Sequence, residues 1–200
     1  MAKVQKKVVS KKTTKEAAPA KKVAKKAVTK KAVVKKTVKQ DISHPNLPKV
    51  GDKAPQFSLL DQNGKTVSLK DFKGKNVVVY FYPRALTPGC TVQACSLTDA
   101  QSELKKLDIV VLGISADPVK KLKDFETKKD LNFTLLSDED HKVCEAYGSW
   151  GLKKFMGREF MGILRQSFFI GKDGKILHVM TKVDTKTHHQ EVIKFFKNLE

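Results

Sequence analysis

The sequence has no apolar run of about 18 residues that could cross a membrane, and no apolar stretch near its start like that of a secretory signal. Only three of its 200 residues are cysteine, an odd number in a chain long enough to fold without disulfide bonds. We therefore expect a reducing compartment, in which the cysteines serve chemistry or packing. The first forty residues also lack arginine, which argues against a mitochondrial presequence.

Positive charge is concentrated at the amino terminus. Residues 1–40 hold fifteen lysines and one glutamate, so they supply +14 of the net charge of +19. They contain no aromatic residue and little that could form a core. The composition predicts a disordered Lys-rich tail over residues 1–43 and a folded domain over residues 44–200.

Three functions are open for the basic tail. It could be a solvated extension that aids solubility, or it could bind DNA without sequence preference through lysine–phosphate contacts. It could also bind an anionic lipid surface or an acidic protein. The lack of aromatic residues argues against sequence-selective binding of single strands. A bacterial cytoplasm with nucleoid association fits this composition best, with a nucleus or an organelle as the alternative because a Lys-rich tail can be an import signal.

The remaining residues alternate between strand and helix patterns. Apolar runs predict buried strands at 76–82, 108–115 and 133–138, and helical patterns occupy 91–107, 118–130, 139–148 and 187–199. A Lys-Asp-Gly-Lys turn within residues 167–180 predicts a β-hairpin. The segment 44–55, with three prolines, is expected to be a linker and the start of the domain. These patterns predict an α/β fold: a mostly parallel sheet with an antiparallel edge and helices on both faces.

Two cysteines follow the first predicted strand. If Pro88 lies in the first turn of a helix, Cys90 sits at the helix N-terminus, where free N–H groups and the helix dipole favour a thiolate. Cys95 lies five residues on, which in a regular helix separates the two Cα atoms by about 8.6 Å. A disulfide tolerates about 4.4–6.8 Å. Either the two cysteines never bond, or their bonding unwinds the helix.

The three cysteines also allow structural, zinc-binding and oxidoreductase interpretations. Cys144 has the pattern of a small buried hydrophobic residue within a helix. A zinc site made of Cys90, Cys95, His141 and Cys144 is disfavoured, because two ligands spaced C-x4-C at one helix start make a poor clamp. A thioredoxin-like disulfide oxidoreductase is disfavoured because the spacing is not C-x2-C.

The stretch PRALTPGCTVQAC, residues 83–95, closely resembles the active-site loop of peroxiredoxins of the bacterioferritin-comigratory, or Q-type, subfamily. The similarity runs from about Val50 to the C-terminus and includes LLSDEDHKVCEAYG and RQSFFIGKDGKI. It implies a thioredoxin-like fold, a central mixed β-sheet flanked by helices. It also implies thiol-based reduction of hydrogen peroxide and organic hydroperoxides, with no metal or organic cofactor.

The same resemblance assigns roles to individual residues. Cys90 matches the peroxidatic cysteine, and Pro83 and Thr87 match the active-site proline and threonine. Arg165 matches the arginine that stabilises the thiolate and polarises the peroxide. Cys95 matches the resolving cysteine of some members, which implies an intramolecular disulfide that thioredoxin or a similar dithiol reduces. The resemblance further implies a monomer.

Several other polar residues have less specific interpretations. Thr87 is expected either to cap the helix or to hydrogen-bond a substrate oxygen. Gln93 could brace the active-site loop or be an exposed polar residue, and Arg84 is expected at the rim of the site. His188 and its neighbour His189 are expected to be surface or capping residues. The competing interpretation of the whole chain is a thioredoxin-fold, nucleic-acid-associated binding protein with little peroxidase activity.

Overall fold

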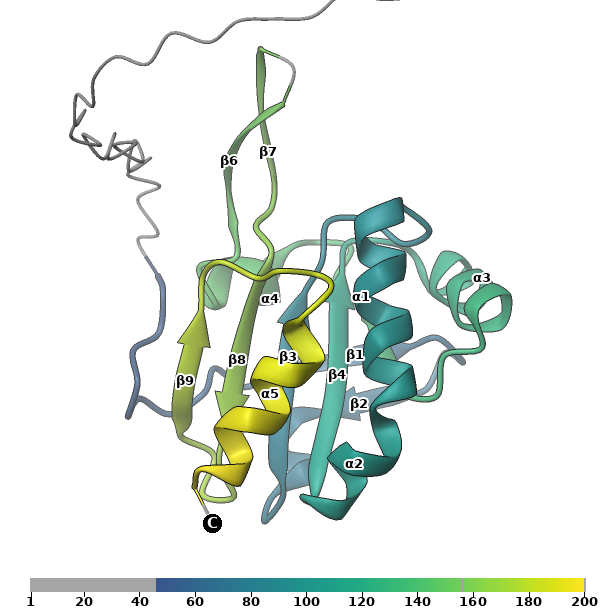
Figure 1. The fold of residues 1–200 in the computed structure, drawn as a ribbon. Coiled ribbons are helices and arrows are strands. Elements are labelled where there is room, and N and C mark those ends of the chain that lie inside the picture. Colours follow the sequence, from purple (N-terminus) through teal and green to yellow (C-terminus); the bar gives the residue numbers. More distant parts are fainter. Residues whose placement is uncertain (1–45, 156, 200) are drawn as a thin grey trace, which may run out of the picture. The chain divides into compact units, whose positions relative to one another are not determined.

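The computed structural model describes residues 46–155 and 157–199 (Figure 1). The predicted basic tail and its boundary with the domain lie outside these residues. Within them, no helix has both the length and the hydropathy that crossing a membrane requires.

A seven-stranded sheet forms the centre of the domain, in the order β2-β1-β5-β4-β3-β8-β9. Only the pairs β3–β4 and β4–β5 are parallel, and the other four pairs are antiparallel. The sheet is therefore mixed, as the resemblance implied, and the expectation of a mostly parallel sheet is wrong. Its strands are β1 (Ser58–Asp61), β2 (Thr66–Ser68), β3 (Asn76–Phe81), β4 (Ile109–Ser115), β5 (Thr134–Ser137), β8 (Gln166–Ile170) and β9 (Ile176–Met180).

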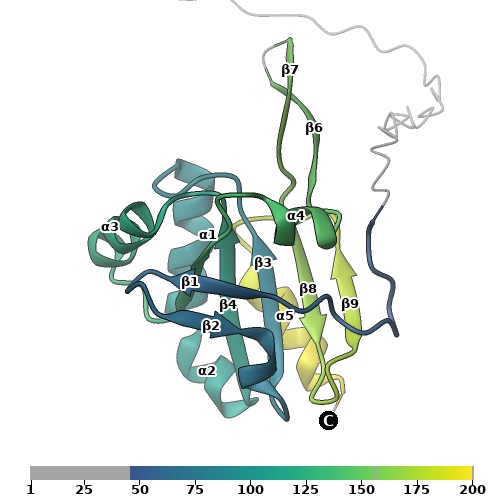
Figure 2. The same ribbon diagram turned by 180° about the vertical axis from the view of Figure 1, so that it is seen from behind.

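Helices cover both faces of this sheet, as Figures 1 and 2 show from opposite sides. One core cluster joins the sheet to four helices through residues such as Tyr80, Leu97 and Val192. These helices are α1 (Pro88–Asp99), α2 (Gln101–Lys106), α3 (Val119–Lys129) and α5 (His188–Lys197). On the opposite face a second cluster, with Phe81 and Cys144, packs under α4 (Lys142–Ala146) and the 3₁₀ segment η1 (Leu69–Phe72). Alternate side chains of the buried strands thus supply two separate cores.

The predicted helix over residues 91–107 differs from the structure at both ends. It begins earlier, at Pro88. Proline suits the first position of a helix because the N–H group of a residue there has no partner within the helix, so nothing is lost when it is missing. It also divides at Ala100 into α1 and α2. The strand β1 and a hairpin made of β6 (Trp150–Phe155) and β7 (Arg158–Ile163) were not predicted.

The β6–β7 hairpin pairs only with itself and projects from the body of the domain (Figure 1). Its two strands are antiparallel, with Leu152 opposite Met161 and Lys153 opposite Phe160. Leu152, Met161 and Phe160 are about half exposed. Because neither face of the hairpin is fully buried, its sequence lacks the alternation that marks a strand of a packed sheet.

The segment expected to be a linker is partly an integral element of the domain. The amide of Gly51 donates to the carbonyl of Ile176 over 2.8 Å, and the amide of Ile176 donates to the carbonyl of Asp52 over 2.9 Å. Further upstream the backbone of Leu47 lies against Gly148, where an added Cβ atom would come within 2.8 Å of the Leu47 nitrogen. Gly148 also has a φ of +61°, so both the space and the backbone conformation require glycine.

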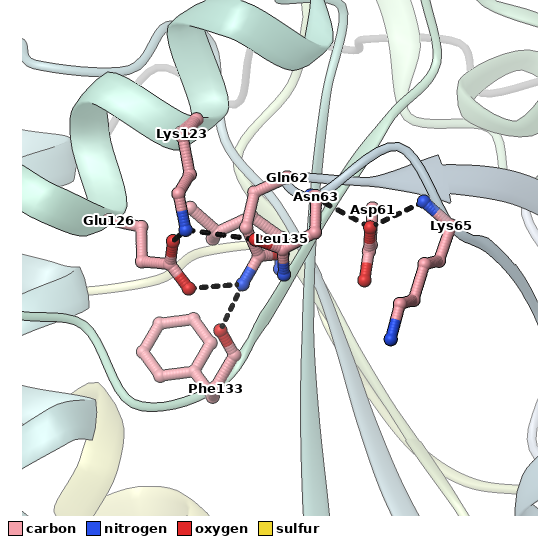
Figure 3. Close-up of polar contacts among 8 residues, drawn as sticks. All are labelled: Asp61, Gln62, Asn63, Lys65, Lys123, Glu126, Phe133 and Leu135. Atoms are coloured by element: carbon pink, nitrogen blue, oxygen red, sulfur yellow. Dashed lines mark hydrogen bonds and ion pairs between the residues drawn. The ribbon is translucent and has the colours of Figure 1, made fainter.

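A buried glutamine ties the β1–β2 turn to α3 and to the neighbouring strand β5 (Figure 3). The side-chain amide of Gln62 donates to Glu126 in α3 over 2.8 Å and to the carbonyl of Phe133 over 3.3 Å. Its oxygen accepts the amide of Leu135 in β5 over 2.9 Å. One side chain thus satisfies two backbone groups and a carboxylate. The exposed side chain of Lys123 also bonds the carboxylate of Glu126, over 2.5 Å.

We predict that Gln62→Ala lowers the free energy of unfolding by about 1–3 kcal/mol, because it leaves buried backbone groups without a partner. The matched control is Lys123→Ala, which removes an exposed ion pair at the same carboxylate and should cost less than about 1 kcal/mol. Chemical denaturation of both variants measures the difference. Equal losses in the two variants would contradict the importance given to Gln62.

Candidate active site

The loop between β3 and α1 is held at the carboxyl ends of the central strands. The amide of Ala85 donates to Asp117 Oδ2 over 2.6 Å, and Asp117 is a buried residue just beyond the end of β4. Ser115 and Lys121 bond the same carboxylate over 3.1 and 2.5 Å. Within this loop Leu86 has a φ of +64°, a conformation that non-glycine residues rarely adopt. The anchored carboxylate and the strained residue together fix where α1 begins.

Thr87 directly precedes helix α1 and has extended backbone angles, and Pro88 takes the first helical position. The Thr87 side chain makes no capping hydrogen bond, so the capping alternative is wrong. Its hydroxyl donates instead to the carbonyl of Arg84 over 2.9 Å. With its proton engaged there, the Thr87 oxygen is free to accept a hydrogen bond from an O–H group.

Cys90 lies in the first turn of α1 and is only 2% exposed. The Nη2 atom of Arg165, which directly precedes β8, lies 3.3 Å from the Cys90 sulfur. The first N–H groups of the helix have no partner within the helix and point toward its N-terminal end. A guanidinium and a helix N-terminus thus both place positive charge beside this sulfur, which stabilises negative charge on it.

Cys95 lies in the same uninterrupted helix and is half-buried. Neither it nor Cys90 is in a disulfide. Because α1 is α-helical from Pro88 to Asp99, the helical estimate of about 8.6 Å between the two Cα atoms applies to this state. The fold therefore presents the two thiols on one helix without allowing them to bond.

Gln93, also in α1, is fully buried and connects Arg165 to a histidine. Its amide oxygen accepts a short hydrogen bond from Arg165 Nη1, and its nitrogen lies 3.1 Å from Nδ1 of His188. The other ring nitrogen of His188 lies 2.9 Å from the hydroxyl of Ser167 in β8. Of the two roles weighed for Gln93, bracing the site is therefore the one that the structure supports.

The expectation that His188 is a surface or capping residue is wrong. The side chain is fully buried at the first position of α5. Burial, with smaller contributions from the charges of Arg165 and His189, lowers the pKa of His188 to about 3. The ring is therefore neutral near pH 7. The sequence carried no local signal for this, because the hydrogen-bond partners of His188, Ser167 and Gln93, lie 21 and 95 residues away along the chain.

Comparison with known proteins identifies the family of proteins to which this chain belongs. Residues 50–179 match the AhpC/TSA family. Peroxiredoxin Bcp of Escherichia coli K12 is 58% identical over 149 residues, which span 74% of this chain and 96% of that protein. A putative peroxiredoxin bcp of Haemophilus influenzae is also 58% identical, over 75% of this chain and 97% of that protein. The chain belongs to the AhpC/TSA family as a peroxiredoxin of the Bcp type.

Two solved structures agree with this assignment. The peroxidoxin BcpB of Mycobacterium tuberculosis is 31% identical with a TM-score of 0.68, over 76% of this chain and 98% of that one. The bacterioferritin comigratory protein of Xanthomonas campestris, studied for its alkyl peroxide reduction activity, is 29% identical with a TM-score of 0.68. It matches over 72% of this chain and 91% of that one. The thioredoxin-like fold and the enzyme interpretation are therefore confirmed: the protein is a thiol peroxidase.

The remaining residues of interest in this peroxiredoxin lie around the same loop. Pro83 is half-buried just after β3, and Arg84 is exposed, as expected of a rim residue. Cys144 is fully buried, as predicted for a small hydrophobic residue, and burial raises the pKa of its thiol far above the usual range. Among residues 46–155 and 157–199, no three His, Cys, Asp or Glu side chains gather as metal ligands would.

A second cation near the site was missed by the sequence analysis. Lys153, in β6, donates to the carbonyl of Ile163 over 2.9 Å and is half-buried. Burial lowers the pKa of Lys153, the neighbouring charge of Arg165 lowers it further, and Cys90 raises it. The base of the β6–β7 hairpin therefore contributes positive charge to the active site of this peroxiredoxin. Lys153 had no sequence signal because the hairpin itself was not predicted.

We predict that Arg165→Lys lowers kcat/KM for hydrogen peroxide by about 100-fold. Lysine keeps the charge, but a single ammonium group cannot replace two guanidinium nitrogens, one on Gln93 and one on the Cys90 sulfur. Steady-state kinetics with a dithiol reductant measure the loss. The control is Arg84→Lys, at an exposed position, which should leave the rate unchanged. Wild-type activity in Arg165→Lys would show that the charge alone suffices.

Proposed function

We propose that this peroxiredoxin reduces hydrogen peroxide and organic hydroperoxides with Cys90 as the peroxidatic and Cys95 as the resolving cysteine. The observation that carries this assignment is the 3.3 Å contact between Arg165 Nη2 and the sulfur of Cys90 at a helix N-terminus. Of the three cysteines, only Cys90 has this combination of a cation and free backbone N–H groups.

In the first step the Cys90 thiolate attacks one oxygen of the hydroperoxide. A sulfur–oxygen bond forms as the oxygen–oxygen bond breaks, and the other oxygen leaves as water or an alcohol after taking up a proton. Arg165 and the N–H groups of the first helical turn stabilise charge on the two oxygens. The Thr87 oxygen accepts a hydrogen bond from the O–H of the substrate, since its own proton is engaged by Arg84. Pro83 shields the thiolate from water.

In the second step the Cys95 sulfur attacks the sulfenic acid of Cys90, forming a disulfide and releasing water. A separation of about 8.6 Å between the Cα atoms exceeds the limit of about 6.8 Å for a disulfide. The first turns of α1 must therefore unwind before this step. The unwinding breaks the contacts of Gln93, which lies between the two cysteines.

In the third step a dithiol reductant restores both thiols. Thioredoxin, or a protein with a similar dithiol, reduces the Cys90–Cys95 disulfide by two successive thiol–disulfide exchanges. The cycle needs no metal, no organic cofactor and no second copy of the chain, which is consistent with a monomer.

Cys144 is the alternative resolving residue, and its position argues against it. It is fully buried in the core cluster on the face of the sheet opposite to the cluster that contains Cys90. Reaching Cys90 would require the sheet itself to open. Cys95, half-buried and on the same helix, requires only local unwinding.

The test is the intact mass of reduced protein treated with one equivalent of hydrogen peroxide. We predict that the wild type loses two hydrogen atoms, that Cys90→Ser does not react, and that Cys95→Ser accumulates a sulfenic acid that a dimedone probe traps. Cys144→Ala is the control and should behave as the wild type. A Cys90–Cys144 disulfide would keep the peroxidase and refute the role of Cys95. A Cys90 that peroxide does not oxidise within seconds would refute the whole cycle.

We further propose that the Lys-rich tail, residues 1–43, binds DNA without sequence preference and associates the enzyme with the nucleoid of a bacterial cytoplasm. The support is its composition: fifteen lysines against one glutamate within forty residues. Lysine–phosphate contacts release counterions, so several together give affinity without base recognition.

We predict that the full-length protein binds duplex DNA with an affinity that falls linearly on a log–log plot against salt concentration. A full-length variant with the fifteen tail lysines replaced by glutamine should lose this binding and keep wild-type peroxidase activity. Fluorescence anisotropy over a salt series measures both proteins. Equal DNA binding by the two proteins would show that the tail lysines are not the DNA-binding groups. No binding by either protein would refute the proposal that the tail binds DNA.

A further inference from the structure

Four polar side chains continue inward from the Cys90 sulfur as one chain of hydrogen bonds. Arg165 contacts Cys90 and Gln93, Gln93 contacts His188, and His188 contacts Ser167. Gln93, His188 and Ser167 are all fully buried. The proposed cycle gives no role to either His188 or Ser167, the last two members of this chain.

The direction of every bond in this chain follows from Arg165, because a guanidinium can only donate. Gln93 must therefore present its oxygen to Arg165, which turns its NH₂ group toward Nδ1 of His188. Nδ1 must accept, so it carries no proton. The single proton of the neutral ring is then on Nε2, where it donates to the hydroxyl of Ser167.

The ring is also fixed in position by its surroundings. His188 is the first residue of α5, and its backbone N–H donates to the carbonyl of Asp184 over 3.0 Å. Its ring centroid lies 5.9 Å from that of Tyr80 in β3. The titratable or charged groups that face it are Tyr80, Arg165 and His189. None of them is a carboxylate, so no neighbour favours a second proton on the ring.

We propose that His188 is a positioning residue for the peroxidase reaction: by accepting from Gln93 at Nδ1 it locks the amide that aims Arg165 at Cys90. This inference rests on the proposed roles of Cys90 and Arg165. Without an acceptor at Nδ1, the buried NH₂ group of Gln93 loses its partner, and the bond to Arg165 is the one contact left among the described residues to orient the amide. The amide then moves more freely, and Arg165 is held less firmly toward the sulfur.

Two substitutions of His188 separate positioning from packing. In His188→Asn the side-chain oxygen can occupy the place of Nδ1 and still accept from Gln93, whereas the contact with Ser167 is lost. In His188→Gln the amide reaches the place of Nε2 and can bond Ser167, whereas the acceptor for Gln93 is lost. Both variants put a neutral amide in the same buried site, so they carry similar packing costs. His189→Asn and His189→Gln, at the half-buried neighbour, are the controls.

The measurement is the rate at which peroxide oxidises Cys90 in a single turnover, in a Cys95→Ser background that isolates the first step. We expect His188→Asn to stay within about threefold of the wild type and His188→Gln to be slower by about tenfold or more. Both control variants should match the wild type.

Thermal unfolding of the same proteins tells the two explanations apart. If His188 only fills space, the two variants lose stability together and their rates stay equal to each other, which would overturn the proposal. A wild-type Cys90 that peroxide does not oxidise would refute the proposed function itself, an outcome distinct from equal rates in an active enzyme.

A second measurement needs no variant and covers the case in which the substitutions do not fold. Long-range nitrogen–proton NMR correlations of the full-length reduced protein identify which ring nitrogen of His188 carries the proton. The proposal requires the proton on Nε2 at neutral pH. A proton on Nδ1, or on both nitrogens, would overturn it.

Discussion

The spacing of two cysteines on one helix is the constraint on which the rest of the structure depends. While α1 is intact, its N-terminus and Arg165 surround the Cys90 sulfur, and the same helical geometry keeps Cys95 too far away to bond. In the proposed cycle, the helix must therefore be well ordered to react with peroxide and must lose that order to form the disulfide. Under that proposal, its contacts need to be specific enough to shape the site and few enough to be broken at each turnover.

The structure meets both demands through the position of Gln93. This residue lies between the two cysteines, and its bonds to Arg165 and His188 exist only while the first turns of α1 are helical. In the proposed cycle, the same two bonds order the guanidinium before the chemical step and resist the unwinding after it. The loop that precedes α1 is fixed separately, through the bond from the Ala85 amide to Asp117. Unwinding can therefore proceed without moving the end of β3.

Local patterns predicted the parts of the fold that are buried or sharply bounded. The run 76–82, the hairpin 167–180 and the placement of Cys90 at a helix start all follow from periodicity, turn chemistry and Pro88. Pairings between distant segments did not: β1 enters antiparallel beside β5, and the exposed β6–β7 hairpin has no buried face to mark it. His188 shows the same limit at the site, since its hydrogen-bond partner Gln93 is 95 residues away along the chain.

The two core clusters lie on opposite faces of the sheet, and only one of them contains Cys90. Cys90 and Ala94, which lie in the part of α1 that unwinds in the proposed cycle, belong to the core cluster on the face covered by α1 and α5. The cluster beneath α4, with Phe81, Tyr147 and Phe168, contains neither of them. The proposed unwinding of α1 therefore disturbs the packing of one core, while the other core can hold the strands of the sheet in register. On that proposal, a turnover exposes the apolar groups of only one face of the sheet to water.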